Sequence, residues 1–355
     1  MKKTIMIGIA LSLFFLFTLS AFAQRQMEYL DRGTVAVNTD NGVFISWRIR
    51  AEEYKKAGYN IYKDGQKLNR APITGASNYL DPNGSPDSQY TIKAVVNGEE
   101  LNESLVAEVW ENNYLEVPLQ TPEDYSPNDA SVGDLDADGQ YEIVLHQTGQ
   151  GHDNSHRGLT DEPILQAYEM DGSLLWEINL GKNIREGAHY TQFMVYDLDG
   201  DGISEIACKT APGTKDGTGA FLSKGPAASD DDQADYRMKE GRSKGYILSG
   251  PEYLTIFDGK TGKELATTKY IPPRIEGTTE YDPKKMDELW GDDYGNRVDR
   301  FLACIAYLDG KKPSVVMCRG YYTRTVLAAW NWRDGELNHV WTFDSNDPGK
   351  EEYAG

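Results

Sequence analysis

Two short segments place carboxylates at alternating positions, an arrangement that gathers oxygen ligands around a hard cation. One runs from Asp134 to Glu142 and the other from Asp197 to Glu205. In each, positions one, three, five and nine are acidic, Gly at position six permits a sharp bend, and position seven can offer its backbone carbonyl. The expected Ca²⁺ ligands are Asp134, Asp136, Asp138, Gln140 and Glu142 in the first loop and Asp197, Asp199, Asp201, Ile203 and Glu205 in the second.

The spacing separates these loops from other acidic turns. The closing acid comes at position nine and a strand follows at once, which fits a hairpin better than the helix pair of an EF-hand. Mg²⁺ suits such a flexible acidic cluster less well than the larger ion, and a merely solvated turn explains one copy more readily than two. Because an ion inside a hairpin pins the turn, we expect both sites to be structural. A third related stretch, 307–315, keeps Asp309 but carries Lys311, so we expect no ion there.

A second group of residues could recognise an anionic sugar. Arg and Tyr recur in the segments 183–193, 295–300 and 319–324, next to the starts or ends of repeated strands. Guanidinium groups bind carboxylates and aromatic faces cover the apolar side of a sugar ring. The expected substrate contacts here are Arg185, Arg300, Arg319 and Tyr322. For Arg185, Arg297 and Arg300, ion pairs that orient acidic loops are an equally good interpretation.

The elements that carry these residues repeat three times after Pro118. Each unit has an acidic or related loop, a strand, and then an Asp-Gly turn between two further strands; the units cover roughly 132–176, 195–265 and 305–341. This pattern predicts four-stranded blades of a β-propeller. A ring usually takes about four to eight blades, so the sequence predicts a partial propeller. Insertions at about 210–249 and 275–300 are where we expect substrate contacts.

The region before Pro118 has a different pattern. Short β-rich runs such as 43–47, 59–62 and 90–96 are separated by Asp-Gly, Asn-Gly and Pro-Asn-Gly turns. They predict a small fibronectin type III-like β-sandwich, with Trp47 in its core. We therefore expect an all-β protein with a signal peptide at 1–23, a sandwich at 24–118 and a propeller domain at 119–355.

The N-terminus and the composition limit location and partners. Lys2-Lys3, an apolar run and Ala21-Phe22-Ala23 have the order of a cleavable signal peptide, although a retained anchor is the alternative. Cleavage near Ala23 predicts a secreted or periplasmic monomer with no membrane attachment. The net charge of -20 argues against nucleic-acid binding. The three cysteines lie in strand-like runs and are expected to be buried free thiols.

Four motifs together resemble the family 11 rhamnogalacturonan lyases. They are 189–202, with the sequence HYTQFMVYDLDGDG, and 248–255, 290–301 and 319–322. The resemblance covers essentially the whole chain after the signal segment. It implies an eight-bladed propeller behind a small β-domain, Ca²⁺ dependence, and β-elimination at galacturonate linked to rhamnose in pectin. It also implies that Asn128, in the stretch Ser-Pro-Asn-Asp, contacts the pectic substrate.

The chain departs from the family pattern at one place. Where family members have Lys-Trp-Asp, this chain has His146-Gln147-Thr148. The change puts the usual rhamnose contact in doubt and predicts an altered subsite preference. His146, His152 and His156 offer a transition-metal site as an alternative, but they lack a carboxylate-backed spacing on one element.

β-Elimination requires a base and a group that neutralises the uronate carboxylate. The candidates in this chain are His189, Tyr190, Lys209, Arg297 and Arg324. A Lys beyond this chain is an equally compatible base, and we expect this chain alone to be inactive. A non-catalytic calcium propeller that binds glycans or proteins explains the acidic loops equally well. A hydrolase with paired carboxylates fits less well, because most of the carboxylates that can be placed belong to the loops.

Overall fold

The computed structural model describes residues 25–353, and their regular secondary structure is mostly β-strand. The expected signal peptide, residues 1–23, lies outside the described residues. Within 25–353, no helix is both long enough and apolar enough to span a bilayer.

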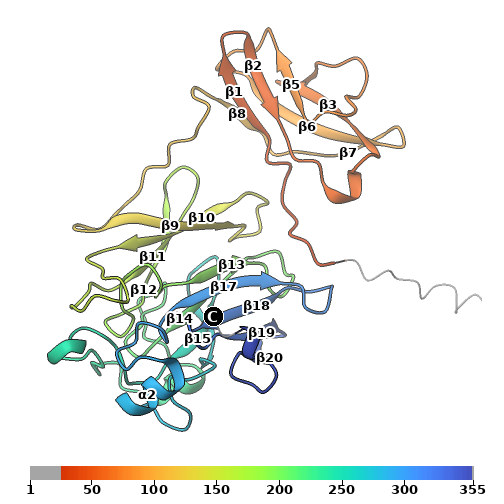
Figure 1. Cartoon of the computed structure of the whole chain (residues 1–355). Coiled ribbons are helices and arrows are strands. Elements are labelled where there is room, and N and C mark those ends of the chain that lie inside the picture. Colours follow the sequence, from red (N-terminus) through yellow and green to blue (C-terminus); the bar gives the residue numbers. More distant parts are fainter. Residues whose placement is uncertain (1–24, 354–355) are drawn as a thin grey trace, which may run out of the picture.

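The first eight strands form one sheet that encloses its own core (Figure 1). In β6, Tyr90, Ile92 and Ala94 alternate inward, as a half-buried strand requires. Trp47 is 5% exposed and its ring lies 5.3 Å from that of Tyr59, so its predicted core position is confirmed. The strands are β1 (Val35–Thr39), β2 (Gly42–Ser46), β3 (Ala57–Lys63), β4 (Gln66–Lys67), β5 (Asn78–Asp81), β6 (Gln89–Val96), β7 (Glu99–Glu103) and β8 (Ala107–Trp110), in the order β4-β3-β6-β8-β1-β2-β5 with β7 on β6.

The three predicted repeats form three antiparallel four-stranded sheets. In each, every strand pairs with the next along the chain. The first contains β9 (Ser126–Gly133), β10 (Glu142–Thr148), β11 (Ile164–Tyr168) and β12 (Leu174–Asn179). The second contains β13 (Phe193–Tyr196), β14 (Glu205–Thr210), β15 (Tyr253–Phe257) and β16 (Glu264–Lys269). The third contains β17 (Phe301–Ala306), β18 (Ser314–Arg319), β19 (Val326–Arg333) and β20 (Glu336–Asp344).

Two hydrophobic cores join neighbouring sheets. β9 contacts β13 and β13 contacts β17, so the first strands of the three sheets lie side by side. Apolar residues of the first two sheets share one core, which includes Val144 and Phe193. A second core joins the second and third sheets through Ile256 and Trp330. Because β14 packs between both cores, all six of its residues are buried.

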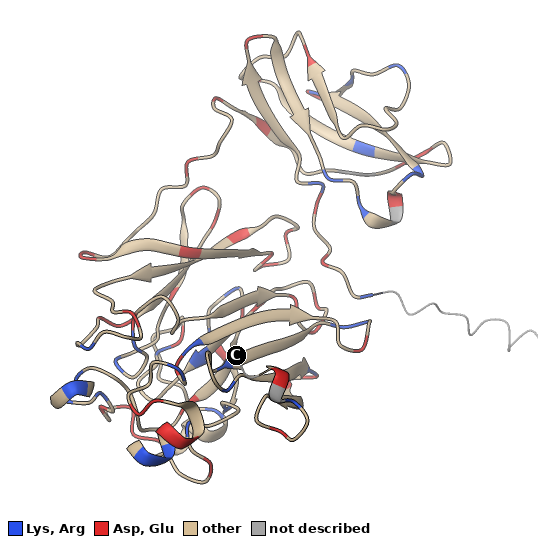
Figure 2. Cartoon of the chain, in the orientation of Figure 1, with Lys and Arg blue, Asp and Glu red and all other residues tan. Residues whose placement is uncertain are grey.

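The loops of these sheets gather at two opposite ends. The acidic end consists of the loops 134–141, 197–204 and 307–313, which join the first strand of each sheet to the second. The insertion end consists of the segments after β10, β14 and β18 and those before β13 and β17. In Figure 1 helix α2 (Pro283–Trp290) lies on the insertion side, and in Figure 2 most acidic residues fall in loops and at strand ends.

Both long insertions are ordered around short helical turns. Asp282 caps α2 by accepting hydrogen bonds from the backbone N–H groups of Lys284 and Lys285, and Gly291 ends it with a φ of 82°. The 3₁₀ turns are Ala51–Glu53, Gly225–Ser229, Gly241–Ser243 and Glu351–Tyr353.

The prediction that all cysteines are buried was wrong for one of them. Cys208 is buried and Cys318 is partly buried, but Cys304 is exposed. Cys304 shares the outward face of β17 with Leu302, which is also exposed. All three are free thiols.

Candidate functional site

The first acidic loop brings three carboxylates to one point. Ligand oxygens of Asp134, Asp136 and Glu142 all lie within 4.8 Å of one another. The backbone holds them there, because Asp134 accepts hydrogen bonds from the N–H groups of Ala137 (2.7 Å) and Gly139 (2.9 Å). Gly139 has a φ of 89°, the conformation for which the sequence places Gly at position six.

The second loop has the same construction. Asp197, Asp199 and Glu205 form the equivalent cluster. Asp197 accepts from Gly200 at 2.7 Å and Gly202 at 3.2 Å, and Glu205 accepts from the N–H of Leu198 at 2.8 Å. Identical spacing thus produces the same pattern of backbone hydrogen bonds in both loops.

The fifth-position carboxylates stand outside these clusters. Asp138 accepts a hydrogen bond from the N–H of Gln140, and Asp201 accepts one from Ile203. Their role as ligands, and that of the carbonyls of Gln140 and Ile203, remains a prediction. In the third loop Asp309 accepts hydrogen bonds from the N–H groups of Lys311 and Lys312.

The electrostatics of both clusters favour a bound cation. Burial raises the pKa of Glu142 to about 7 and of Glu205 to about 9, and the neighbouring aspartates add to both shifts. Burial also raises the pKa values of Asp134, Asp197 and Asp199. A hard divalent cation relieves both the desolvation and the repulsion, and the all-oxygen donor sets fit Ca²⁺.

At the insertion end, His189 and Arg300 are neighbours on the segments that lead into β13 and β17 of adjoining sheets. The backbone N–H of Phe301 donates to the carbonyl of His189 at 3.1 Å, which holds the entries to β13 and β17 together. The Arg300 guanidinium is fixed by Asn296, whose backbone and side-chain oxygens each accept a hydrogen bond at 2.9 Å. It also lies 5.3 Å from the ring centroid of Tyr322.

The open group formed by His189, Arg300 and Tyr322 combines an exposed aromatic ring with polar and charged side chains, as a polar subsite does. Tyr322 is exposed and has a φ of 70°, an uncommon backbone conformation for a bulky residue. Partial burial, and then the nearby Arg300, lower the pKa of His189, while Asp153 acts in the opposite direction. His189 is therefore held neutral near pH 7 beside a permanent positive charge.

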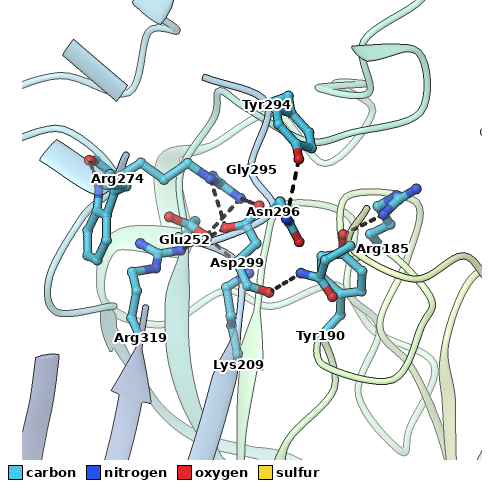
Figure 3. Close-up of polar contacts among 12 residues, drawn as sticks. Arg185, Tyr190, Lys209, Glu252, Arg274, Tyr294, Gly295, Asn296, Asp299 and Arg319 are labelled. Carbon is cyan, nitrogen blue, oxygen red and sulfur yellow. Dashed lines mark hydrogen bonds and ion pairs between the residues drawn. The ribbon is translucent and has the colours of Figure 1, made fainter. Parts of the chain in front are cut away.

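Two other predicted residues, Lys209 and Arg319, belong to a buried ionic network (Figure 3). Arg319, which is fully buried, donates to Glu252. Glu252 also pairs with Lys209 at 3.1 Å and Arg274 at 3.0 Å. Asp299 accepts from Arg274 at 3.2 Å and lies 3.5 Å from Arg319. Burial opposes ionisation of Glu252, but the three cations outweigh it and hold the pKa of its carboxyl far below the usual range.

The neighbouring pair Arg185 and Tyr190 is also enclosed. Arg185 donates to the Tyr190 hydroxyl, and its guanidinium lies 4.2 Å from the ring centroid of Tyr246. Burial raises the pKa of Tyr190 well above its ordinary value, with Arg185 opposing the shift, so the hydroxyl stays protonated. In the state described, these buried groups orient one another and the surrounding loops.

A family model supplies the decisive comparison. The C-terminal domain of rhamnogalacturonan lyase family 11 matches residues 114–355, and the β-sheet domain of rhamnogalacturonan I lyases matches residues 25–110. The chain belongs to rhamnogalacturonan lyase family 11.

Characterised relatives agree with this assignment. The rhamnogalacturonan exolyase YesX of Bacillus subtilis is 52% identical over 94% of this chain and 53% of the relative. The rhamnogalacturonan endolyase YesW of the same organism is 53% identical over 94% of this chain and 52% of the relative. This family 11 chain thus spans about half the length of the curated relatives that it matches.

Solved structures of family 11 lyases share the fold. The crystal structure of the exotype lyase YesX superposes with a TM-score of 0.85, covering 94% of this chain and 53% of that one, at 52% identity. YesW gives 0.84 at 53% identity, and the PL11 lyase of Bacillus licheniformis gives 0.84 at 52% identity. Each covers 94% of this chain and 55% of the solved chain.

The remaining predicted catalytic residues of this family 11 chain, Arg297 and Arg324, have carboxylate partners. Arg297 is 3.8 Å from Asp292. Arg324 pairs with Asp344 and lies 4.4 Å from the ring centroid of Trp290. These contacts give both arginines structural partners.

The departure from the family pattern on β10 produces specific local contacts. The exposed Asn128 donates from its amide to the Thr148 hydroxyl at 2.8 Å. His146 is buried 3.0 Å from Glu186, so its partner is a carboxylate on the segment before β13.

Sequence reasoning missed Glu252, Arg274 and Asp299. Glu252 and Asp299 lie inside motifs that carry the resemblance, 248–255 and 290–301. Their place in these motifs is the sequence signal that could have marked them as functional. Nothing in their local spacing shows that three segments, far apart in the chain, meet at one buried point.

Proposed function

We propose that this protein is a calcium-dependent rhamnogalacturonan lyase that cleaves the rhamnose–galacturonate backbone of pectin by β-elimination. Membership of the family and the lyase names of both relatives support this activity. The structural observation that carries the proposal is the position of neutral His189 beside Arg300 and the exposed Tyr322.

These three side chains match the needs of the reaction. The guanidinium of Arg300 pairs with the uronate carboxylate, which offsets the negative charge that grows as the C5 proton leaves. The imidazole of His189 takes that proton as general base, the C4–O4 bond breaks, and its departing oxygen acquires a proton. The electrons of the C5–H bond form the C4=C5 double bond of the product. Tyr322 offers an aromatic face to a neighbouring sugar ring.

The buried groups are weaker candidates for the base. Lys209 is 6% exposed in its side chain and held by Glu252, and Tyr190 is 4% exposed and bonded to Arg185. We assign Lys209, Tyr190, Arg185 and Arg319 to positioning the insertion end. Arg297 and Arg324, with their own carboxylate partners, have the same role.

Ca²⁺ has a separate role in this proposal. When bound, it neutralises the carboxylates of the acidic loops and pins their hairpins. Asp134 directly follows β9, whereas Asn128 lies near the start of that strand, so six residues of strand separate the two by roughly 20 Å. The acidic loops therefore stabilise the sheets at a distance from the proposed chemistry.

The finer architecture is part of the same proposal. The first strands of the three sheets lie side by side, which supports the proposal that each sheet is one blade of a β-propeller. We propose eight blades for the complete family fold. We assign residues 24–118 to a fibronectin type III-like domain and 119–355 to the propeller domain. We further propose a monomer, secreted after removal of residues 1–23, that takes pectic polysaccharide and not nucleic acid.

An absorbance assay tests the activity. The complete gene product is incubated with rhamnogalacturonan I, in calcium and in chelator, while ultraviolet absorbance of the unsaturated uronate is followed. A calcium-dependent rise is the expected result. No rise from folded, calcium-loaded protein would overturn the lyase assignment.

The same assay separates the proposal from the alternative function. Retained binding of rhamnogalacturonan I without unsaturated product would favour a non-catalytic calcium-binding propeller. The acidic loops alone are compatible with that function, whereas the His189–Arg300 pair is specific to the catalytic one.

A further inference from the structure

Residues 25–32, the N-terminal strap, cross the acidic end and contact all three of its loops. Gln26 is the central contact. Its side-chain amide donates to the backbone carbonyl of Asp197 at 3.0 Å, and its own N–H donates to the carbonyl of Lys311 at 2.7 Å. Its carbonyl accepts from the Tyr307 hydroxyl at 2.7 Å. One residue therefore joins the second acidic loop to the third loop.

The strap continues to the first acidic loop. The N–H of Asp31 donates to the carbonyl of Gly139 at 2.7 Å, and Glu28 accepts from the Tyr141 hydroxyl at 3.2 Å. The approach is close: a Cβ on Gly139 would lie 3.2 Å from the Asp31 nitrogen, and one on Gly200 would lie 2.7 Å from the Gln26 side chain. The glycines that form the cation loops also admit the strap.

The other end of the strap is fixed to the segment between β2 and β3 of the N-terminal sheet. Arg32 makes a two-pronged ion pair with Glu53, at 2.7 and 2.5 Å, and both residues are at most 3% exposed. Arg50 donates to the carbonyl of Leu30 at 2.9 Å. The strap is therefore held at both ends, by the N-terminal sheet and by the three loops (Figure 1).

The third loop differs from the others in what holds it. Its carboxylate, Asp309, accepts from its own backbone. The strap supplies outside bonds, and Arg25 lies 4.6 Å from the ring centroid of Tyr307. Arg333 adds a cation, donating to the carbonyls of Leu198 and Pro313. Strap and guanidinium together tie this loop to its neighbour.

We propose that the strap couples cation binding in the acidic loops to docking of the N-terminal sheet. The carbonyls that hold it, those of Asp197 and Gly139, belong to the loops whose shape a cation fixes. Glu28 adds an electrostatic link, because Asp134 and Asp197 both repel its carboxylate, and a divalent cation in each loop turns that repulsion into attraction. This coupling goes beyond the lyase activity and does not depend on it.

Linkage makes the coupling reciprocal. If a bound cation favours the docked strap, the docked strap raises cation affinity by the same factor. Removing one hydrogen bond between strap and loop, worth about 0.5–1.5 kcal/mol, should therefore weaken binding roughly 2- to 13-fold. The effect should appear at the second loop, where Gln26 contacts Asp197.

Calorimetry with CaCl₂ on Gln26→Ala tests the prediction. The variant keeps the backbone bonds of residue 26 and loses only the amide. Gln66→Ala, at an exposed position on β4, is the matched control. We expect one of the two calcium sites to weaken in Gln26→Ala and neither to change in Gln66→Ala. Equal calcium affinities in the two variants would overturn the coupling.

Limited proteolysis with trypsin gives a second readout that does not involve calorimetry. Cleavage after Arg25 and Arg32, mapped by mass spectrometry, should accelerate at least about tenfold when chelator replaces calcium. Circular dichroism identifies conditions where the sheets remain folded. Unchanged strap cleavage under those conditions would contradict the proposal. If chelator unfolds the whole protein, the calcium affinities of the two variants decide.

Discussion

The acidic end and the insertion end of the three sheets are built in opposite ways. At the acidic end, the two loops that begin at Asp134 and Asp197 are short, share one sequence pattern, and hold their carboxylates with hydrogen bonds from their own backbone. At the insertion end, the segments differ in sequence, and an important contact joins different sheets, as Glu252 beside β15 pairs with Arg319 of β18.

The difference separates stability from chemistry. A repeated loop can be optimised once for holding an ion, whereas substrate recognition needs different groups converging on one molecule. The insertion end supplies these on long segments anchored by a buried ionic network. Substitutions at the two ends should therefore have effects of different kinds.

The largest expected effect is on turnover, from His189→Asn. The amide cannot accept the C5 proton, so kcat should fall by about 10² to 10⁴. The melting temperature should change little, because the half-buried ring lies outside the ionic network. Absorbance kinetics together with thermal unfolding of the complete gene product check both parts. Near-normal turnover would remove His189 as the base.

The second effect is on stability, from Glu252→Gln. Removing this buried charge leaves Lys209, Arg274 and Arg319 facing one another without their shared anion. The free energy of unfolding should fall by about 3–5 kcal/mol. Denaturant titration measures it, with the exposed Glu336→Gln as control. A loss no larger than that of the control would show that the network adds nothing to stability.

Metal removal should act at the acidic end and depend on pH. In the folded protein without cation, the pKa of Glu205 is about 9 and that of Glu142 about 7, both above the ordinary value. Such groups stabilise the fold at low pH, and this contribution is lost as pH rises from about 4.5 to 9. Chelator should therefore lower the melting temperature more at pH 8 than at pH 5, as thermal scans would show. The reverse order would contradict this view of the clusters.

The smallest expected effect is from Gln140→Ala. If position seven contributes only its backbone carbonyl, losing this exposed side chain should change calcium affinity less than about twofold. Asp134→Asn, which alters a clustered carboxylate, should weaken the first site strongly by comparison. Calorimetry on the two variants distinguishes them. Equal losses of calcium affinity in the two variants would show that the Gln140 side chain contributes to binding in addition to its backbone carbonyl.

Local patterns explain which features the sequence could predict. The loops from Asp134 and Asp197 were predictable because their ligand spacing, glycines and following strands are all contiguous in the chain. The three sheets were predictable from the recurring loops and Asp-Gly turns between strands. The core position of Trp47 was predictable from the alternation of apolar residues along its strand. The family resemblance located the motifs around His189 and Arg319 without saying how they meet.

Long-range convergence explains what the sequence could not predict. Arg319 looked like a substrate contact because it follows a strand end and precedes two tyrosines, yet it is fully buried against Glu252. Lys209, the penultimate residue of β14, is buried in the same way. Whether such a cation meets a sugar or a carboxylate depends on Glu252, which lies 67 positions from Arg319 along the chain, and no local spacing encodes that.

The strap also has a consequence for the order of folding. Gln26 and Tyr307 are separated by 281 positions in the chain, so their bond closes one of the longest loops in the molecule. At about 5–20 residues per second, ribosomes make the partner of Gln26 roughly 15–60 seconds after Gln26 itself. The N-terminal sheet can complete its own core in that interval, but the strap must wait. Among the described residues, one of the earliest segments to be synthesised is thus among the last to reach its native contacts.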